Sequence, residues 1–387
     1  MKKIAIFGST GSIGTSLINI IAKDKKKVKI ILLTANTNYK KLIKQVKFFN
    51  VKNIIITDEK SYLITKKILK NKDINIYNNF KSLKKIFNKK KIDYTMSAIS
   101  GFEGLKPTLD VIRFTKIIAI ANKESIICGW HLIKKNIKKY NTKFIPVDSE
   151  HFSIWSLINK DKSNQLEKVY ITASGGPFRK YPLNQFKNIS PQKALIHPNW
   201  SMGKKISIDS ATMMNKVFEI IEAKKIFNLK YNQLEILIHP QSYLHAIVKF
   251  KNGLTKLLVH DTNMTIPIFN SIYPNHEKEI KSKSLDIKIL NNLNLKIVDK
   301  KRYPLVKLID DLGDKDSLFE TVIVCANDRL VHKFLNYEIS YINISKILLK
   351  VIYLKEFAKY KKITPKKIID IQRLSKLVSL KVDNLSI

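Results

Sequence analysis

The N-terminal stretch Lys2-Lys3-Ile4-Ala5-Ile6-Phe7-Gly8-Ser9-Thr10-Gly11-Ser12-Ile13-Gly14 decides the fold of this chain. Its apolar run predicts a buried strand, and apolar residues at helical spacing from Leu17 to Ile21 predict a helix. Glycines between a strand and a helix permit a tight turn and let the backbone approach a pyrophosphate at the helix N-terminus. The spacing is G-x-x-G-x-x-G, so only the flanking strand and helix make the loop a predicted dinucleotide site. The alternative is a tight turn that binds no ligand.

Apolar runs alternate with lysine-rich helical stretches over residues 1 to about 145. Strands that alternate with helices form βαβ units, so this part of the chain predicts a parallel sheet. The expected strands are Ile4–Phe7, Val28–Leu33, Asn53–Thr57, Ile74–Tyr77, Tyr94–Ala98, Ile117–Ala121 and Lys143–Val147.

The rest of the chain has a mixed pattern and then a helical one. Residues 148 to about 290 predict a helix at Ala211–Phe227 among several strands. Beyond about residue 300, apolar residues at three- and four-residue spacing predict helices at Leu318–Asn336 and Ile342–Tyr360. The strands expected in the middle part are Val169–Ala173, Glu235–Ile238, Ala246–Phe250 and Thr255–Val259.

The chain is strongly basic, with 71 Lys and Arg against 31 Asp and Glu and a formal net charge of +40. Such a charge raises the possibility of nucleic-acid binding. Only five of the 71 basic residues are Arg, the residue favoured for bidentate contacts to bases and phosphates. The lysines are also spread over the whole chain, so we expect solvated lysine-rich faces that attract small anions, and no nucleic-acid partner.

The sequence also bears on the compartment. No run of about 18 apolar residues is present, so we expect no membrane-spanning helix. The chain enters its first strand at once, without the apolar region of a signal peptide. Cys128 and Cys325 are its only cysteines, which excludes a disulfide framework and favours a reducing cytoplasm.

The second predicted strand is followed by Asn36-Thr37-Asn38. NAD-dependent enzymes usually carry a carboxylate there, which binds the 2′-hydroxyl of the ribose. Neutral side chains tolerate a 2′-phosphate, so the segment favours NADP over NAD.

Asn122-Lys123-Glu124 comes at the carboxyl end of a predicted strand, where α/β sheets bind their ligands. It predicts a polar ligand site or, equally, a capped helix start with surface charges. Ala173-Ser174-Gly175-Gly176 also follows a strand, and its amides and hydroxyl suit either an anion or a simple turn.

The segment Pro146-Val147-Asp148-Ser149-Glu150-His151 places two carboxylates two positions apart in this basic chain. Carboxylate oxygens are the ligands that Mg²⁺ and Mn²⁺ prefer, so Asp148 and Glu150 predict a divalent-cation site. The alternative is a pair of acids that stabilises a helix N-terminus.

The longest motif runs from His197 to Glu219. Its first part, to residue 205, contains Pro, Gly and an isolated Trp and predicts a mobile loop with a stacking group. In the following helix Asn215, Lys216 and Glu219 share one face, where Glu219 is suited to be a third metal carboxylate. The alternative is a surface ion pair on a core helix.

Five motifs in chain order, namely the glycine loop and the segments at 122–124, 146–151, 174–178 and 197–219, closely resemble the 1-deoxy-D-xylulose 5-phosphate reductoisomerase family along essentially the whole chain. The resemblance implies a metal, Mg²⁺ or Mn²⁺, held by Asp148, Glu150 and Glu219, and a closing loop with Trp200 and Met202. It implies catalytic roles for Glu150, Lys123 and His197. Implied NADPH contacts are Thr10, Gly11, Ser12, Ile13, Asn38, Asn122, Glu124 and Gly203. Implied substrate contacts are Lys123, Ser149, Glu150, Ser174, His197, Ser210, Asn215, Lys216 and Glu219.

The resemblance also implies an α/β architecture assembled as a homodimer. We expect a Rossmann-like, parallel-sheet NADPH domain at 1–147, an α+β catalytic domain at 148–290, and a connecting segment with a C-terminal α-helical domain at 291–387. The implied reaction rearranges 1-deoxy-D-xylulose 5-phosphate to a branched aldehyde and reduces it to 2-C-methyl-D-erythritol 4-phosphate, in isoprenoid precursor biosynthesis. The chain departs from the family at Asn36-Thr37-Asn38, where the family often has Gly-Lys-Asn.

Two other functions are compatible with single features. An ordinary NADP-dependent dehydrogenase would explain the glycine loop. Such an enzyme needs neither the three carboxylates nor the motif at 197–219. A nucleic-acid-binding protein would account for the charge, although we see no patterned basic face with Arg and aromatic residues.

Overall fold

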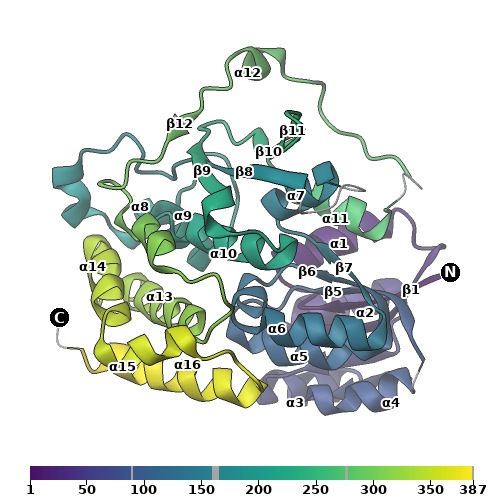
Figure 1. Cartoon of the computed structure of the whole chain (residues 1–387). Helices are drawn as coiled ribbons and strands as arrows, with labels where there is room; N and C mark the ends of the chain where they lie inside the picture. The colour runs from purple at the N-terminus through teal and green to yellow at the C-terminus, as the bar shows by residue number, and fades with distance from the viewer. Residues whose placement is uncertain (89, 159–164, 275–277, 386–387) are drawn as a thin grey trace. The chain divides into compact units, whose positions relative to one another are not determined.

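The computed structural model describes residues 1–88, 90–158, 165–274 and 278–385. The chain forms two compact units, which we describe separately (Figure 1). The first unit contains Met1–Ser125, Leu132–Asp148 and Met264–Lys281. The second contains Ile126–His131, Ser149–Asn263 and Ser282–Ile387.

The first unit is built on a parallel sheet of seven strands in the order β4-β3-β2-β1-β5-β6-β7. The predicted parallel sheet is therefore confirmed. Strands β1 and β2 carry apolar runs at residues 4–7 and 30–33, as expected where helices cover both faces of a sheet. The strands are β1 Lys2–Phe7, β2 Val28–Ala35, β3 Asn53–Ile56, β4 Asn75–Tyr77, β5 Ile92–Ser97, β6 Thr115–Ile120 and β7 Lys143–Pro146.

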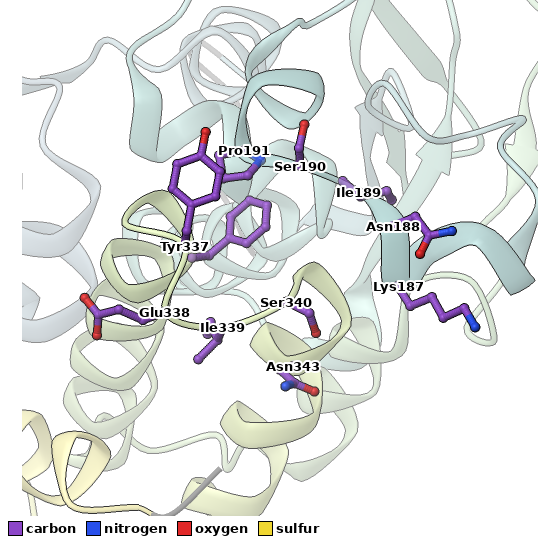
Figure 2. A pocket seen from close by; sticks show the side chains of 11 residues that line it. Lys187, Asn188, Ile189, Ser190, Pro191, Tyr337, Glu338, Ile339, Ser340 and Asn343 are labelled. Carbon is purple, nitrogen blue, oxygen red and sulfur yellow. The ribbon is translucent and has the colours of Figure 1, made fainter.

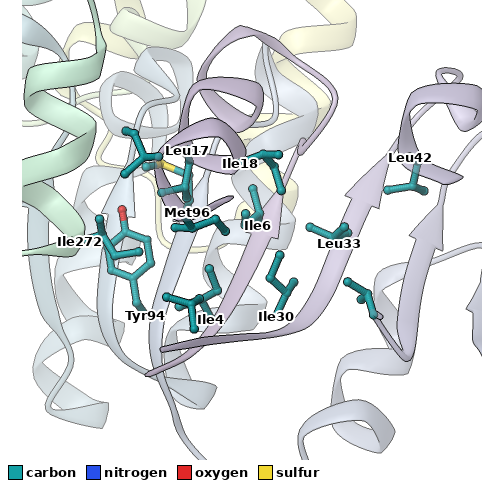
Figure 3. Packing of buried hydrophobic residues seen from close by; sticks show 14 of the residues in the cluster. Ile4, Ile6, Leu17, Ile18, Ile30, Leu33, Leu42, Tyr94, Met96 and Ile272 are labelled. Atoms are coloured by element: carbon teal, nitrogen blue, oxygen red, sulfur yellow. The ribbon is translucent and has the colours of Figure 1, made fainter. Parts of the chain in front are cut away.

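A core of Ile, Leu and Val side chains joins this sheet to its helices (Figure 3). Ile4 and Ile6 of β1 are fully buried and lie in one cluster with Leu17 of α1. Ile272 of α11, in the segment Met264–Lys281, belongs to the same cluster. The hydroxyl of the adjacent Ser271 lies 2.7 Å from the hydroxyl of Tyr94. The helices of this unit are α1 Ser12–Ala22, α2 Tyr39–Phe49, α3 Glu59–Ile68, α4 Leu83–Phe87, α5 Leu105–Val111, α6 Lys123–Tyr140 and α11 Thr265–Ile272; residues 126–131 of α6 belong to the second unit.

The strand order reverses at β1, which pairs with β2 on one side and β5 on the other. Open α/β sheets bind ligands at this point, beyond the carboxyl ends of the strands. The glycine loop lies here, and two of its glycines have no room for a side chain. A Cβ on Gly8 would lie 2.6 Å from the carbonyl oxygen of Ala98, and one on Gly14 would lie 2.3 Å from the carbonyl oxygen of Gly8.

The second unit contains a mixed sheet of five strands in the order β11-β10-β8-β9-β12. Strand β8 runs parallel to β9 and antiparallel to β10, and the two outer pairs are antiparallel. The four strands predicted for this part are all present. They are β8 Leu166–Ala173, β9 Leu234–Ile238, β10 Leu244–Phe250 and β11 Thr255–Val259, with a short β12 at Lys296–Ile297.

Helices make up the rest of the second unit. Helix α13 contacts both α14 and α16, and most of its residues are buried. It therefore forms the centre of the helical segment. The helices are α7 Ser149–Ile158, α8 Pro191–Leu195, α9 Lys204–Ala211, α10 Met214–Phe227, α12 Ile287–Asn291, α13 Phe319–Leu335, α14 Tyr341–Ile352, α15 Lys355–Ala358 and α16 Ile368–Asp383.

Two predicted helices differ from the observed ones. The helix expected at Ala211–Phe227 starts only at Met214, because Met213 takes a left-handed conformation with φ of 66° and separates α9 from α10. The helix expected at Ile342–Tyr360 ends at Ile352, because Leu354 is extended (ψ 132°) before the short α15. In both cases the apolar spacing continues across the break, so periodicity alone could not reveal it.

The three-domain division stays a prediction. The structure groups residues 149–263 and 282–387 in one unit, and it assigns Met264–Lys281 to the unit of the parallel sheet. Among the described residues, no helix is long and apolar enough to cross a membrane. Cys128 and Cys325 are both buried free thiols, and burial raises the pKa of Cys128 well above its usual value.

Candidate active site

Three carboxylates converge where strand β7 leads into helix α7. Asp148 follows β7, Glu150 lies in the first turn of α7, and Glu219 lies in α10. One oxygen of each side chain lies within 4.8 Å of the other two, and Glu150 and Glu219 are buried. No other group of three or more His, Cys, Asp or Glu residues in the described ranges is placed to hold a metal. This set of hard oxygen ligands fits Mg²⁺ or Mn²⁺.

Lysines neutralise most of this negative charge. Lys216 pairs with Glu150 and, at 2.5 Å from Nζ to Oε2, with Glu219. Lys123, the first residue of α6, pairs with Asp148. Three carboxylates and two ammonium groups leave a net charge of −1, which a divalent cation would change to +1. The site would then favour an anionic substrate.

The position of Glu219 depends on contacts that surround α10. The side-chain amide of Asn215 donates to Oε1 of Glu219 at 2.5 Å, so the residues predicted to share a helix face do so. His151 is completely buried and its Nε2 lies 2.9 Å from the carbonyl oxygen of Glu219, to which it donates. His151 belongs to the acidic motif, and no sequence pattern assigned it a role. Its position directly after Glu150 was the sequence signal that could have indicated a role at this site.

A second cluster brings together residues predicted to bind the substrate phosphate. Oγ of Ser174 lies 3.0 Å from Nε2 of His197 and accepts the backbone N–H of Gly176 at 3.0 Å. Gly176, with φ of 65°, packs so closely that a Cβ would lie 3.0 Å from the carbonyl oxygen of Ser210. Ser174, His197 and Ser210 therefore lie around one glycine turn, as an anion site requires.

The glycine turn is held by residues that the sequence analysis missed. The hydroxyl of Tyr303 donates to the carbonyl oxygen of Gly175 at 2.7 Å, and burial raises its pKa to about 12, so it stays protonated. The guanidinium of Arg302 donates to the carbonyl oxygens of Phe178 and Tyr181, which follow the turn. Arg302 and Tyr303 lie more than 120 residues after the glycine turn, in a segment without a motif, so no sequence signal indicated them.

His197 is fixed in one neutral tautomer. Its Nδ1 accepts the backbone N–H groups of Asn199 at 3.2 Å and Trp200 at 3.0 Å, so Nδ1 carries no proton. Nε2 must then carry the proton and donate to Ser174. Burial, and second the charge of Lys216, lower the pKa of His197 to about 4.

The predicted flexible loop starts at this histidine. Asn199 anchors it by donating to the carbonyl oxygen of Pro240 at 2.6 Å and to the hydroxyl of Ser242 at 2.8 Å. Trp200 meets the ring of His245 edge-on at 6.1 Å between centroids. Met202 is half-buried, and Gly203 is exposed at the start of α9, with no atom within 4 Å of the position of a Cβ.

The predicted cofactor contacts in the glycine loop surround the start of α1. Gly11 is the N-cap of that helix and makes no side-chain cap, and no acidic residue is present in the first turn. Gly11 and Ser12 are exposed, and Thr10 and Ile13 are partly exposed. The amide groups of this turn can therefore meet a phosphate, so the loop fits a dinucleotide. Asn38 caps the next helix, α2, by accepting the N–H of Lys41 at 3.2 Å.

Asn122 and Glu124 are both buried at the start of α6. The side-chain oxygen of Asn122 caps the helix by accepting the N–H of Ser125 at 2.5 Å. Its side-chain nitrogen donates to the carbonyl oxygens of Ile99 and, at 2.7 Å, Gly101. The side chain of Asn122 thus holds the loop after β5, and a cofactor contact through it stays a prediction.

The second unit also contains a pocket of about 420 Å³ (Figure 2). Its walls come from residues 187–191, Phe334, the turn at 337–340 before α14, and Asn343 in the first turn of α14. None of the predicted catalytic, metal or substrate residues lines it, so we do not assign the reaction to this pocket.

Comparison with known proteins identifies the family. Three models match the chain: 1-deoxy-D-xylulose 5-phosphate reductoisomerase at residues 4–129, its C-terminal domain at 144–227, and a further DXP reductoisomerase C-terminal domain at 260–378. The 1-deoxy-D-xylulose 5-phosphate reductoisomerase of Pelagibacter ubique (strain HTCC1062) is 68% identical over 388 residues, covering 100% of both chains. The chain belongs to the 1-deoxy-D-xylulose 5-phosphate reductoisomerase family.

More distant members of this family agree. The enzyme of that name from Clostridium novyi (strain NT) is 38% identical over 90% of this chain and 91% of its own. A crystal structure of DOX-P reductoisomerase with NADPH, fosmidomycin and magnesium has a TM-score of 0.90 at 31% identity, covering 99% of this chain and 98% of its own. The Zymomonas mobilis reductoisomerase in complex with NADPH has a TM-score of 0.87 at 31% identity, covering 99% and 97%. The predicted fold and family are thus confirmed.

We predict that His197 stays neutral across the physiological pH range. Its folded pKa of about 4 lies below the ordinary value of 6.5, so the unfolded chain takes up a proton first as the pH falls. The stability that this histidine contributes is complete above pH 6.5 and is lost as the pH falls to about 4. An NMR titration of the ring, assigned with His197→Gln, measures this directly. A midpoint near 6.5 would contradict the tautomer and its hydrogen bonds.

Proposed function

We propose that this chain carries out its family's reaction with the two clusters described above. It converts 1-deoxy-D-xylulose 5-phosphate to 2-C-methyl-D-erythritol 4-phosphate with NADPH and a divalent metal, a step of isoprenoid precursor biosynthesis. The convergence of Asp148, Glu150 and Glu219 carries this proposal, because an ordinary dehydrogenase does not need three carboxylates within 4.8 Å. A nucleic-acid function has no comparable support.

Asp148, Glu150 and Glu219 would hold the metal, which supplies Lewis-acid polarisation of the substrate carbonyl and a template for its hydroxyl groups. The support is the donor set itself, three carboxylates that are half-buried or buried. Lys216 and Lys123 lie beside these oxygens and can offset charge that develops on the substrate.

Glu150 is the proposed proton carrier. One of its oxygens accepts the hydroxyl of Ser149 at 2.5 Å, and the other meets the ammonium of Lys216. A carboxylate that is oriented by both contacts, and is itself a proposed metal ligand, lies close enough to a metal-bound substrate to take the proton of its hydroxyl. Lys123, paired with Asp148, is the other group that can move or stabilise this proton.

The substrate phosphate would lie at the glycine turn with Ser174, Ser210, Asn215 and Lys216. The hydroxyl of Ser174, which accepts from the neutral His197, can donate to the phosphate, and Lys216, although paired with Glu150 and Glu219, adds positive charge nearby. Trp200 and Met202 would close over the bound substrate, which excludes water and protects the aldehyde.

NADPH supplies the hydride. We assign its pyrophosphate to Thr10, Gly11, Ser12 and Ile13, because the start of α1 has amide groups without a capping side chain. Asn38, Asn122, Glu124 and Gly203 are further proposed contacts.

The chain is proposed to work in the cytoplasm as a homodimer. Two buried free thiols suit a reducing compartment. The dimer rests on the family resemblance, and light scattering should give a mass twice the 44.8 kDa of the chain at micromolar concentration. A mass of one chain at concentrations that give full activity would exclude an obligate dimer.

Asp148→Asn or Glu219→Gln should reduce kcat by about 1,000-fold or more, because several kcal/mol of charge stabilisation are lost. The assay is oxidation of NADPH with 1-deoxy-D-xylulose 5-phosphate, with Mg²⁺ titrated from an EDTA-treated sample. NADPH affinity should stay within about twofold. Asp73→Asn, at a side chain that is 90% exposed, is the matched control. Full activity of either site variant would refute the metal assignment.

Ser174→Ala and Ser210→Ala should each raise the dissociation constant of the substrate about tenfold, the effect of one lost hydrogen bond to a charged group. The same changes should not alter binding of the dephosphorylated sugar, which makes no contact there. Calorimetric titration of both ligands measures the difference, with the exposed Ser284→Ala as control. Equal losses of affinity for the two sugars would show that the phosphate binds elsewhere.

A further inference from the structure

The end of β2 lacks both of the groups that usually select between NAD and NADP. Asn36, Thr37 and Asn38 are exposed, and none of them is charged. A ribose 2′-hydroxyl is usually met by a carboxylate here, and a 2′-phosphate by a nearby cation. The absence of a carboxylate explains why a phosphate is tolerated. It does not explain what attracts one.

One lysine of the following helix differs from its neighbours. Lys41 lies in the first turn of α2 and is half-buried, whereas Lys40, Lys44 and Lys47 are exposed. Its ammonium donates to the carbonyl oxygen of Thr10 at 3.2 Å. The side chain is therefore directed to the glycine loop and away from bulk solvent.

The same residue is joined to the other proposed cofactor segment. Its backbone N–H donates to the side-chain oxygen of Asn38 at 3.2 Å. Lys41 thus connects Thr10, at the pyrophosphate loop, with Asn38, at the ribose end of β2. A dinucleotide bound along both segments would bring its 2′-position near this ammonium.

The surrounding contacts keep the segment in place. Asn36 donates to the hydroxyl of Thr57 at 3.0 Å, and the hydroxyl of Ser61 donates to the carbonyl oxygen of Thr37 at 3.1 Å. The first turn of α2 contains no acidic residue that could neutralise Lys41. An ammonium has three N–H bonds, so donation to Thr10 leaves two for a phosphate.

We infer that Lys41 is the residue that selects NADPH over NADH, by pairing with the 2′-phosphate. This inference rests on the proposed use of NADPH and adds the residue that determines its preference. Lys41 makes no contact with the reacting atoms, so it acts on cofactor affinity and not on the chemical step.

The experiment compares dissociation constants of NADPH and NADH for the purified full chain, followed by nucleotide fluorescence without substrate. Lys41→Met should weaken the affinity for NADPH by about 10- to 100-fold, the effect of losing a hydrogen bond between charged groups. It should change the affinity for NADH by less than about twofold. Lys41→Arg should keep most of the preference. The exposed Lys44→Met should leave both constants unchanged, and melting curves check that every variant is folded. The pair 2′,5′-ADP and 5′-AMP repeats the comparison without the nicotinamide.

The outcomes separate the possibilities. An equal loss of NADPH and NADH in Lys41→Met would mean that Lys41 only supports the glycine loop, and it would overturn the inference. An unchanged preference, or a larger effect of Lys40→Met, would overturn it as well. Failure of the wild-type chain to bind either nucleotide would instead refute the proposed cofactor.

Discussion

The pairing of Lys216 with Glu150 and Glu219 is the interaction on which the proposed site depends. Three carboxylates this close repel one another, and buried charges are costly without partners. Lysines on neighbouring helices offset that repulsion, so the chain can bring metal ligands together and still fold. Burial is the main cause of the lowered pKa of His197, and the ammonium of Lys216 lowers it further. Lys216 therefore couples the metal ligands electrostatically to the phosphate cluster.

The second constraint is the break between α9 and α10. Met213 is buried and adopts a left-handed conformation that is unfavourable for a residue with a side chain. Because α10 restarts at Met214, Asn215, Lys216 and Glu219 fall in its first two turns. Strain of this kind concentrates at functional sites, where surrounding contacts maintain it. The backbone N–H of Met213 donates to the carbonyl oxygen of Ser210 at 3.2 Å, which is one such contact.

Much of this molecule could be predicted from sequence. The parallel sheet follows from apolar runs between helical stretches, and Glu219 was found because carboxylate and lysine recur at helical spacing. Local patterns cannot show contacts between distant segments, which is why Tyr303 on Gly175 and Lys41 on Thr10 were missed. The Met213 break was missed because apolar periodicity does not record backbone conformation. The charge of +40, conspicuous in the sequence, enters the site only through single lysines.

The uncapped start of α1 has a consequence for how this protein is maintained. Gly11 at the N-cap provides no side-chain cap, and a glycine there costs a helix only a few tenths of a kcal/mol relative to a capping residue. A nucleotide phosphate at the same amide groups would stabilise the helix start from outside the chain. Ligand at 100 times its dissociation constant adds about 2.7 kcal/mol to the folded state. The cofactor pool would then set the fraction of folded protein, and its resistance to proteolysis, as well as the rate of reduction.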